Sequence, residues 1–449
     1  MRTTRSVISR RRFLSRAAGT AATFSLVPSY VAGLHGATSP NNKLHIACIG
    51  VGGRGADDIN ELNSENLVAF CDVDSKQAAA TFKKYPQAKQ YQDFRRMLDE
   101  VGKQIDAVMV ATPDHTHAVA VMRAIKMGKH VYCEKPLAHS IHEVRTIVHA
   151  ARKYKVATQL GNQGHSFPSI RQFCEWIWDD AIGPVREVHA RCRSIYSQIR
   201  NLDRVTETPA VPATLNWDLW LGPAQYRPYN PRYVPGTWRS WMPFGTGVIG
   251  DWTCHVVDPV FWALNLDAPT HIEAETGNYD PEKHGDTFPT GSIIRYDFPA
   301  RGQRPAVKLV WYDGDQAPPR PDEMDPKQKF PDTGAVVIGD KGKIVYGSHG
   351  AAGLRIIPDA KMQEYKQPAE KIPRSPGHHR EWIDACKGGK PAGSNFNYGG
   401  SLVEVALLGI IAMRLKNQKL EWNGAKGKFT NSKAANQLLA TPYRQGWSL

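Results

Sequence analysis

The sequence lacks several features that mark specialised classes of protein. Its seven cysteines are odd in number, widely separated and form no C-x-x-C pair, so neither a disulfide framework nor a zinc knuckle is indicated. We expect no stretch of the chain to cross a bilayer, which takes about 20 apolar residues. Beyond residues 1–33, basic runs and basic residues interleaved with aromatic ones are also missing, which argues against nucleic-acid binding. The length of 449 residues favours two domains, because single cores rarely grow so large.

Acidic residues are absent from residues 1–33, which carry six arginines. Removing these six charges lowers the formal net charge from +14 to +8. Residues 9–15, S-R-R-R-F-L-S, match the twin-arginine pattern S-R-R-x-F-L-K at all but the last position. The apolar stretch at 17–31 is short and rich in small residues, as in a signal peptide. We therefore expect residues 1–33 to be a twin-arginine signal, with cleavage near 31–33, and the protein to be periplasmic or exported.

Residues 43–160 alternate short apolar runs with helical patterns, which is typical of a parallel sheet with crossover helices. The expected strands are 44–49, 67–71, 107–111, 130–133 and 156–160. After residue 161 the alternating segments 292–298, 306–312 and 335–338 predict a mostly antiparallel sheet, with a long apolar helix at 401–415. The expected fold class is α/β, with a Rossmann domain at 43–160 and a large α+β substrate-binding domain at 161–449.

A glycine-rich motif follows the first expected strand. It has the form G-x-G-x-x-G, and the residues we assign to cofactor binding are Gly50, Gly52, Gly53, Arg54 and Gly55. Glycines allow the backbone to approach a pyrophosphate at a helix N-terminus. The next strand ends in Asp72, 22 residues after the first glycine, where an acid accepts hydrogen bonds from ribose hydroxyls. This spacing favours NAD, and the neighbouring arginine leaves NADP as the less favoured alternative.

Two further strands end in polar motifs at the edge where open α/β sheets bind ligands. One motif runs T-P-D-H-T-H from Thr112 and Pro113 to His117, and the other is Glu134-Lys135-Pro136. Together with the glycine loop they resemble the glucose-fructose oxidoreductase / inositol dehydrogenase / rhizopine-catabolism (Gfo/Idh/MocA) family. The resemblance extends over nearly the whole mature chain, including Gly161-Asn162-Gln163 and residues 216–222 and 420–423.

This resemblance implies roles for particular residues. Lys135 would reach the substrate carbinol, Glu134 would shape the nicotinamide pocket, and Asn162 and Gln163 would lie at the cofactor. It also implies a homo-oligomer assembled through the sheet of the second domain.

The segment 247–258, G-V-I-G-D-W-T-C-H-V-V-D, resembles the second motif of the family, D-x-x-x-H. In a helix, Asp251 and His255 would share a face, with Asp258 a further turn along. His255 would act as general base, with Asp251 beside the ring to orient it and stabilise its protonated form. Without the resemblance, a helix cap at Asp251 and a buried His255 would be the favoured explanation of this segment.

The remaining candidates are weaker. Asp258, Arg239 and Trp238 are possible substrate contacts, and the tryptophans at 217, 220, 238 and 241 could stack on a pyranose or belong to the core. Histidines 115, 117 and 165 form no H-x-x-x-H or H-E-x-x-H frame, so we expect no metal site.

The expected function is NAD-dependent oxidation at a carbinol of a sugar or polyol. Outside the cytoplasm a net dehydrogenase has no dependable NAD pool, so a redox-neutral cycle on a tightly held cofactor is favoured. One alternative is a glycoside hydrolase that oxidises C3 transiently, eliminates the aglycone and reduces the ketone again. A second is a sugar-binding module that has lost catalysis.

Overall fold

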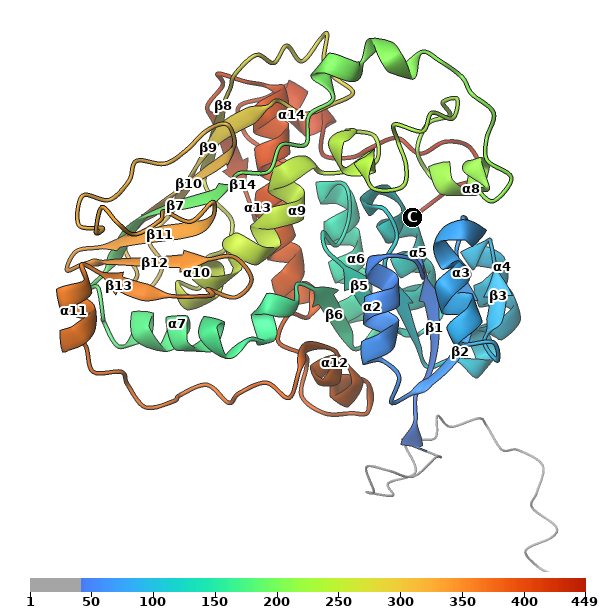
Figure 1. Ribbon diagram of the computed structural model, residues 1–449, viewed down its shortest axis with the longest axis horizontal. Coiled ribbons are helices and arrows are strands. Elements are labelled where there is room, and N and C mark those ends of the chain that lie inside the picture. Colours follow the sequence, from blue (N-terminus) through green and yellow to red (C-terminus); the bar gives the residue numbers. More distant parts are fainter. Residues whose placement is uncertain (1–41) are drawn as a thin grey trace, which may run out of the picture. The chain divides into compact units, whose positions relative to one another are not determined.

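The computed structural model describes residues 42–449, and the expected signal at 1–33 lies outside the described residues. Residues Leu44–Leu449 form one compact unit with two sheets (Figure 1). The first has six parallel strands in the order β3-β2-β1-β4-β5-β6. Its strands are β1 (His45–Ile49), β2 (Asn66–Cys71), β3 (Lys89–Tyr91), β4 (Ala107–Val110), β5 (His130–Glu134) and β6 (Thr158–Gly161).

Five strands of this sheet are confirmed within one or two residues of the expected bounds, and β3 was missed. The central strand β4 is buried along its whole length, as expected for a parallel strand covered on both faces. Strand β3 has only three residues, none buried, at the edge of the sheet, so it lacks the apolar run on which the sequence analysis depended. The helices between these strands are α2 (Arg54–Glu61), α3 (Ser75–Lys84), α4 (Phe94–Val101), α5 (Asp114–Lys126) and α6 (Ile141–Tyr154).

The second sheet has nine strands in the order β13-β12-β11-β7-β10-β9-β8-β14-β15. Its pairs are antiparallel except β7 with β10, which confirms the expected mostly antiparallel sheet. The strands are β7 (Val185–Cys192), β8 (His271–Thr276), β9 (Gly291–Phe298), β10 (Val307–Gly314), β11 (Thr333–Gly339), β12 (Lys343–Gly347), β13 (Arg355–Ile357), β14 (Leu420–Asn423) and β15 (Lys428–Phe429).

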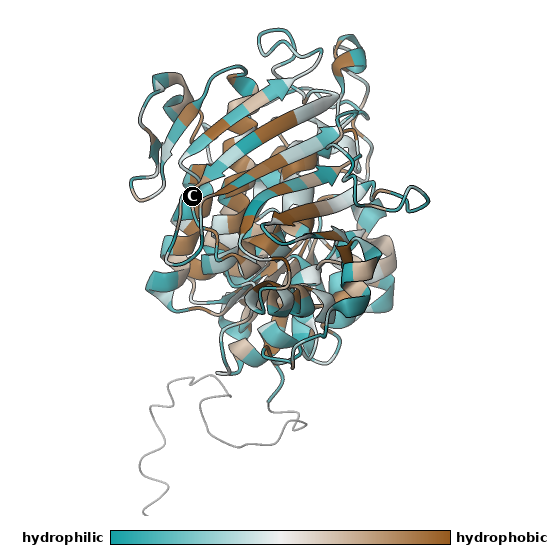
Figure 2. Ribbon diagram, turned by 90° about the vertical axis from the view of Figure 1, so that its left-hand side faces the viewer, coloured by the Kyte–Doolittle hydropathy of each residue, from teal (hydrophilic) through white to brown (hydrophobic). Residues whose placement is uncertain are grey.

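Hydrophobic and hydrophilic residues alternate along several strands of this sheet (Figure 2). In β7 and β9 every second residue is buried, and helices α9 and α13 pack against the sheet. The helices that follow β6 are α7 (Pro168–Trp178), α8 (Trp217–Leu221), α9 (Gly247–Val256), α10 (Asp258–Ala263), α11 (Asp359–Glu364), α12 (His378–Cys386), α13 (Phe396–Arg414) and α14 (Lys433–Gln437).

Two helices from the last quarter of the chain pack onto the earlier parts. Helix α13 contacts α6, α9 and β8, so it joins the two sheets. Among the described residues it is the one helix with the length and apolar character of a membrane span, and most of its apolar window is buried inside the protein. Helix α12 contacts β6, and its Trp382, Ile383 and Cys386 join the core beneath the first sheet. Helices α12 and α13 thus contact elements on the other side of position 161. The domain boundaries 43–160 and 161–449 therefore stay predictions.

Candidate active site

The glycine loop needs glycine for two geometric reasons. Gly50 has a φ of +78°, and a Cβ added there would lie 2.5 Å from the carbonyl oxygen of Ala111. A Cβ at Gly55, the first turn of α2, would lie 2.0 Å from the carbonyl oxygen of Gly50. Both distances are shorter than any real Cβ contact, so the loop can pack this closely only without side chains. Gly50, Gly52 and Gly53 line a cavity of about 560 Å³, whereas Gly55 packs behind the loop.

Asp72 lies beside this loop at the end of β2. Its Oδ2 accepts hydrogen bonds from the backbone N–H groups of Val51 (2.9 Å) and Gly52 (3.2 Å), and its Oδ1 accepts one from Asp74 (3.0 Å). Burial raises the pKa of this carboxyl, and the three N–H donors partly offset the shift. Asp72 also lines the cavity, so its position is compatible with the predicted ribose contact.

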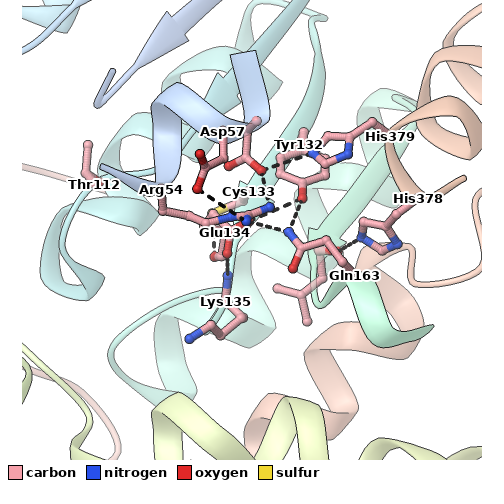
Figure 3. A network of polar contacts seen from close by, with 12 residues as sticks. Arg54, Asp57, Thr112, Tyr132, Cys133, Glu134, Lys135, Gln163, His378 and His379 are labelled. Carbon is pink, nitrogen blue, oxygen red and sulfur yellow. Dashed lines mark hydrogen bonds and ion pairs between the residues drawn. The ribbon is translucent and has the colours of Figure 1, made fainter. Parts of the chain in front are cut away.

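The exposed Arg54 and the buried Glu134 belong to one polar network beside the loop (Figure 3). Arg54 Nε donates to Glu134 Oε1 at 3.2 Å, and its Nη2 donates to Asp58 Oδ1 at 2.7 Å. Gln163 donates to the same Glu134 oxygen at 2.7 Å. Burial, reinforced by the charge of Asp58, raises the pKa of Glu134 to about 7. A third carboxyl group is also near, because Arg54 Nη1 lies 3.8 Å from Asp57 Oδ2. Arg54 is therefore surrounded by carboxyl groups of its own protein.

Three predicted cofactor residues lie at the T-P-x-x-x-H motif. Thr112 and Pro113 line the cavity, but His117 does not. The His117 side chain is buried, with Nε2 2.7 Å from the carbonyl oxygen of Thr112 and Nδ1 2.7 Å from that of Pro136. The predicted direct contact of His117 with the cofactor is therefore corrected. Its ring braces two cavity-wall segments, the turn after β4 and the segment after β5.

The predicted cofactor contact of Asn162 and the predicted substrate contact of Asp258 are corrected for the same reason, since both side chains are buried in the core. Asn162 is fully buried, donating to Asp258 Oδ2 at 3.2 Å and accepting from Ser394 Oγ at 2.6 Å. Asp258 is 1% exposed and also binds His165 and Tyr398. It begins a new helix, α10, rather than continuing α9, so its carboxylate points into the core and not toward a substrate.

The other end of the cavity holds the predicted catalytic residues. Lys135 Nζ donates to the carboxylate Oδ1 of Asp251 and, at 3.2 Å, to its backbone carbonyl oxygen. Tyr196 donates its hydroxyl to Asp251 Oδ2 at 2.9 Å. Burial alone would raise the pKa of Asp251, but the charges of Lys135 and Arg239 hold it well below its usual range. Burial would lower the pKa of Lys135, and the Asp251 charge raises it instead, so this pair is ionised.

His255 lines the cavity one turn after Asp251, but the two side chains do not bind each other. Within residues 42–449, His255 Nδ1 is buried without a hydrogen-bond partner. Its ring stacks on His349, with centroids 4.1 Å apart. Burial, with the nearby charge of Lys135, lowers the pKa of His255 well below its usual range. The expectation that Asp251 orients this ring is therefore wrong, because Asp251 is committed to Lys135 and Tyr196.

All four tryptophans considered for stacking, Trp217, Trp220, Trp238 and Trp241, are buried in one aromatic core cluster. Trp217 and Trp220 stack on each other at 4.8 Å, and an edge of Trp220 reaches the cavity. Trp238 and Arg239 both line the cavity, and the guanidinium lies 4.2 Å from the Trp238 ring centroid. Their assignment to substrate contacts stays a prediction.

Sequence reasoning missed two cavity residues, Trp252 and His349, and also Tyr196, which binds the cavity residue Asp251. Tyr196 and His349 lie outside any motif, on the segments that follow β7 and β12. His349 adopts a left-handed backbone conformation with φ of +56° next to Gly350, and a turn of this kind was the only available signal. Trp252 lies inside the D-x-x-x-H segment, where its partners were not predictable.

The histidines once considered as metal ligands are dispersed. His115 binds the carbonyl oxygens of Trp220 and Phe244, while His165 pairs with Asp258. Among residues 42–449, no group of three or more His, Cys, Asp or Glu side chains could hold a metal ion. All seven cysteines fall in this range, each buried and free.

Comparison with known proteins shows which family this sequence resembles. Residues 44–162 match the family model described as "Oxidoreductase family, NAD-binding Rossmann fold", and residues 200–304 match "Oxidoreductase family, C-terminal alpha/beta domain". Inositol 2-dehydrogenase of Salmonella typhimurium is 28% identical over 154 residues, which are 33% of this chain and 45% of that protein. The match thus spans less than half the length of this relative.

Solved structures extend the likeness in fold. The WlbA dehydrogenase of Bordetella pertussis, in complex with NADH and UDP-GlcNAcA, has a TM-score of 0.59 at 14% identity, covering 85% of this chain and 99% of that one. The aldose-aldose oxidoreductase of Caulobacter crescentus has a TM-score of 0.53 at 17% identity, covering 85% and 100%. With a glycine loop, an E-K-P strand end and a D-x-x-x-H helix around one cavity, the chain is an NAD-binding oxidoreductase of the Gfo/Idh/MocA type.

Proposed function

We propose that the protein oxidises a carbinol of a sugar or sugar-like polyol and works in a redox-neutral cycle on a tightly held NAD. The observation that carries this proposal is the convergence of Lys135, from the end of β5, and His255, from α9, on the cavity lined by the glycine loop. A bound nicotinamide would supply the hydride acceptor.

The side chains of this chain would handle the proton and the developing charge. Lys135 Nζ would donate a hydrogen bond to the substrate oxygen and stabilise it as it becomes an alkoxide. His255 is neutral at rest because burial and the Lys135 charge lower its pKa, so an unprotonated ring nitrogen is available to accept the hydroxyl proton. Asp251, fixed by Tyr196, would keep the lysine charged and aimed.

We propose NAD rather than NADP as the cofactor. Asp72 lines the cavity beside the glycine loop, and its carboxylate would bind the ribose hydroxyls of NAD and repel a 2′-phosphate. Arg54, the one nearby cation considered for NADP, is paired with Asp58 and Glu134. The variant Asp72→Ala should lose far more affinity for NAD than for NADP in titrations with each nucleotide. Equal losses would remove Asp72 from ribose recognition.

The test of the proposal starts from protein purified without added nucleotide. It should retain NAD in near-stoichiometric amount, because a redox-neutral cycle never releases the cofactor. Incubation with a panel of sugars and glycosides, followed by mass spectrometry, should give keto-sugars or a reduced partner sugar. Protein that lacks NAD and fails to bind it would contradict the proposal.

The same incubation in deuterated water distinguishes the proposed oxidoreductase from a glycoside hydrolase. Transient oxidation at C3 with elimination removes and returns the proton at C2, so the recovered sugar would carry deuterium there. Hydride transfer alone leaves C2 unlabelled, and one NMR spectrum therefore decides between the two cycles. A module that only binds sugars would give neither product.

Location and assembly complete the proposal. We propose that residues 1–33 direct export of the folded protein through the twin-arginine pathway, which would carry NAD with it. We also propose a homo-oligomer built on the nine-stranded sheet. Light scattering after size-exclusion chromatography would measure the assembly, and a monomer at micromolar concentration would contradict it.

A further inference from the structure

Two cations share one carboxylate at the substrate end of the cavity. Across residues 42–449, Asp251 is the one acidic side chain within 4.0 Å ion-pair distance of Lys135 or Arg239. Its two carboxylate oxygens already accept hydrogen bonds from Lys135 and Tyr196. Arg239 Nε lies 3.5 Å from Asp251 Oδ1, which is longer than a normal N–H···O hydrogen bond. Asp251 therefore balances the lysine, and the arginine charge is left largely unmatched.

The arginine is held in place without its fork of N–H groups being used. Arg239 lies on the short 3-10 helix η7 (Thr237–Ser240), and its guanidinium stacks over the Trp238 ring at 4.2 Å. Within residues 42–449 the Arg239 side chain makes a single hydrogen bond, and it is a long one of 3.5 Å from Nη1 to the carbonyl oxygen of Gly236. The side chain is 35% exposed and lines the cavity. Stacking of this kind orients the guanidinium plane and leaves its edge free for a planar partner.

The other titratable groups around this end do not supply the missing negative charge. His255 and His349 both have lowered pKa values because they are buried near Lys135, so they are neutral bases. Asp114 is buried and accepts the Thr246 hydroxyl at 2.6 Å, and among the described residues it forms no ion pair with Arg239 within 4.0 Å. Tyr196 is a neutral donor whose pKa is raised by burial and by Asp251. An anionic group on the ligand would complete the charge balance.

We propose that the substrate is a sugar that carries a carboxylate, namely a hexuronate or its glycoside, and that Arg239 binds this carboxylate. The guanidinium fork matches a carboxylate in a planar, two-bond geometry, and Lys135 and His255 remain free for the carbinol. This inference rests on the proposed function, since it names the substrate class of the same site.

The test uses the NAD-loaded enzyme and two readouts. Calorimetric titration with D-glucuronate and D-galacturonate, against D-glucose, D-galactose and glucose 6-sulfate, measures affinity. The absorbance of reduced nicotinamide formed on mixing measures the hydride step. We expect the uronates to bind roughly 10- to 100-fold more tightly than the neutral sugars, the range expected for one charged hydrogen-bonded pair.

Three variants assign the preference to the arginine. Arg239→Gln should erase the preference for uronates, and Arg239→Lys should keep part of it, because the charge remains without the fork. The matched control is Arg193→Gln, whose side chain is 66% exposed and pairs with Asp332. It should leave the preference unchanged. Retained NAD shows that each variant is folded, and if Arg239→Gln loses it, Arg239→Lys carries the comparison.

The possible failures are distinguishable. Neutral or sulfated sugars that bind and reduce the cofactor as well as uronates would overturn the carboxylate inference and leave the proposed function standing. A uronate preference that survives in Arg239→Gln would overturn the role of the arginine. If no sugar of any class reduces bound NAD, the proposed function falls and the inference falls with it.

Discussion

Lys135 and His255 come from elements more than a hundred residues apart, yet both line the cavity on which the proposed chemistry depends. Replacing either by alanine should reduce turnover by about 10²–10⁴-fold, because each removes a proton-transfer or alkoxide-stabilising group. Both variants should still retain NAD, since neither residue is assigned to the phosphates. The measurement is single-turnover reduction of bound cofactor, with His271→Ala as control, because this partly exposed side chain at the start of β8 does not line the cavity. Loss of NAD in either variant would give that residue a structural role.

Tyr196 acts at the residue scale through Asp251 and not through the substrate. The variant Tyr196→Phe keeps the ring and removes one hydrogen bond from the carboxylate, which should raise the pKa of Asp251. We expect turnover to fall roughly 2- to 10-fold, in line with the loss of one hydrogen bond, and the acidic limb of the pH–rate profile to move to higher pH. Tyr226→Phe, at a side chain that is 72% exposed, should change neither quantity. An unchanged pH profile in Tyr196→Phe would refute the positioning role.

At the scale of elements, the glycine loop leaves no space for a Cβ at Gly50, and the effect of this steric clash can be measured separately from that of backbone strain. Gly50 and Gly302 both have positive φ values, +78° and +57°, but only at Gly50 would a Cβ meet other atoms. Gly50→Ala should therefore weaken NAD binding and lower the melting temperature, while Gly302→Ala should show only the strain of about 1 kcal/mol. Nucleotide titration and thermal unfolding measure both effects. Equal losses in the two variants would show that the close approach to Ala111 has no effect.

The polar network that joins α2 and β5 through Arg54 and Glu134 extends to α12, where His379 Nε2 lies 3.0 Å from Asp58 Oδ1. This network should make stability depend on pH. Folding raises the pKa of Glu134 from its ordinary 4.5 to about 7, mainly through burial. A carboxyl with a raised pKa binds its proton more tightly in the folded state, so the free energy of unfolding falls as pH rises from 4.5 toward 7. Glu134→Gln should flatten this decline in denaturant unfolding at saturating NAD. A steeper or unchanged slope in the variant would contradict the assignment.

At the scale of the whole molecule, export can be tested without touching the enzyme. Replacing Arg10 and Arg11 by lysines should leave active, NAD-containing protein in the cytoplasm, because only the expected signal changes. Cell fractionation with a cytoplasmic marker measures the distribution. Unchanged export of the variant would indicate a general secretory route.

The sequence by itself determined the fold class and the ends of the strands that carry the motifs. A parallel strand buried on both faces, such as β4, has to be a continuous apolar run, and a tight loop such as that at Gly50 has to be glycine. These requirements are local, so they can be recognised along the chain. The same local pattern predicted that Thr112 and Lys135 would follow strand ends at one edge of the sheet.

Only the tertiary structure decided which partners these residues meet. Asp251 binds Lys135 and Tyr196 rather than His255, and His255 stacks on His349, because these contacts join segments far apart in the chain. The inward turn of Asp258 likewise depends on its partners in other elements. Side-chain pairing across such distances depends on how helices and sheets pack, which no spacing along the sequence records.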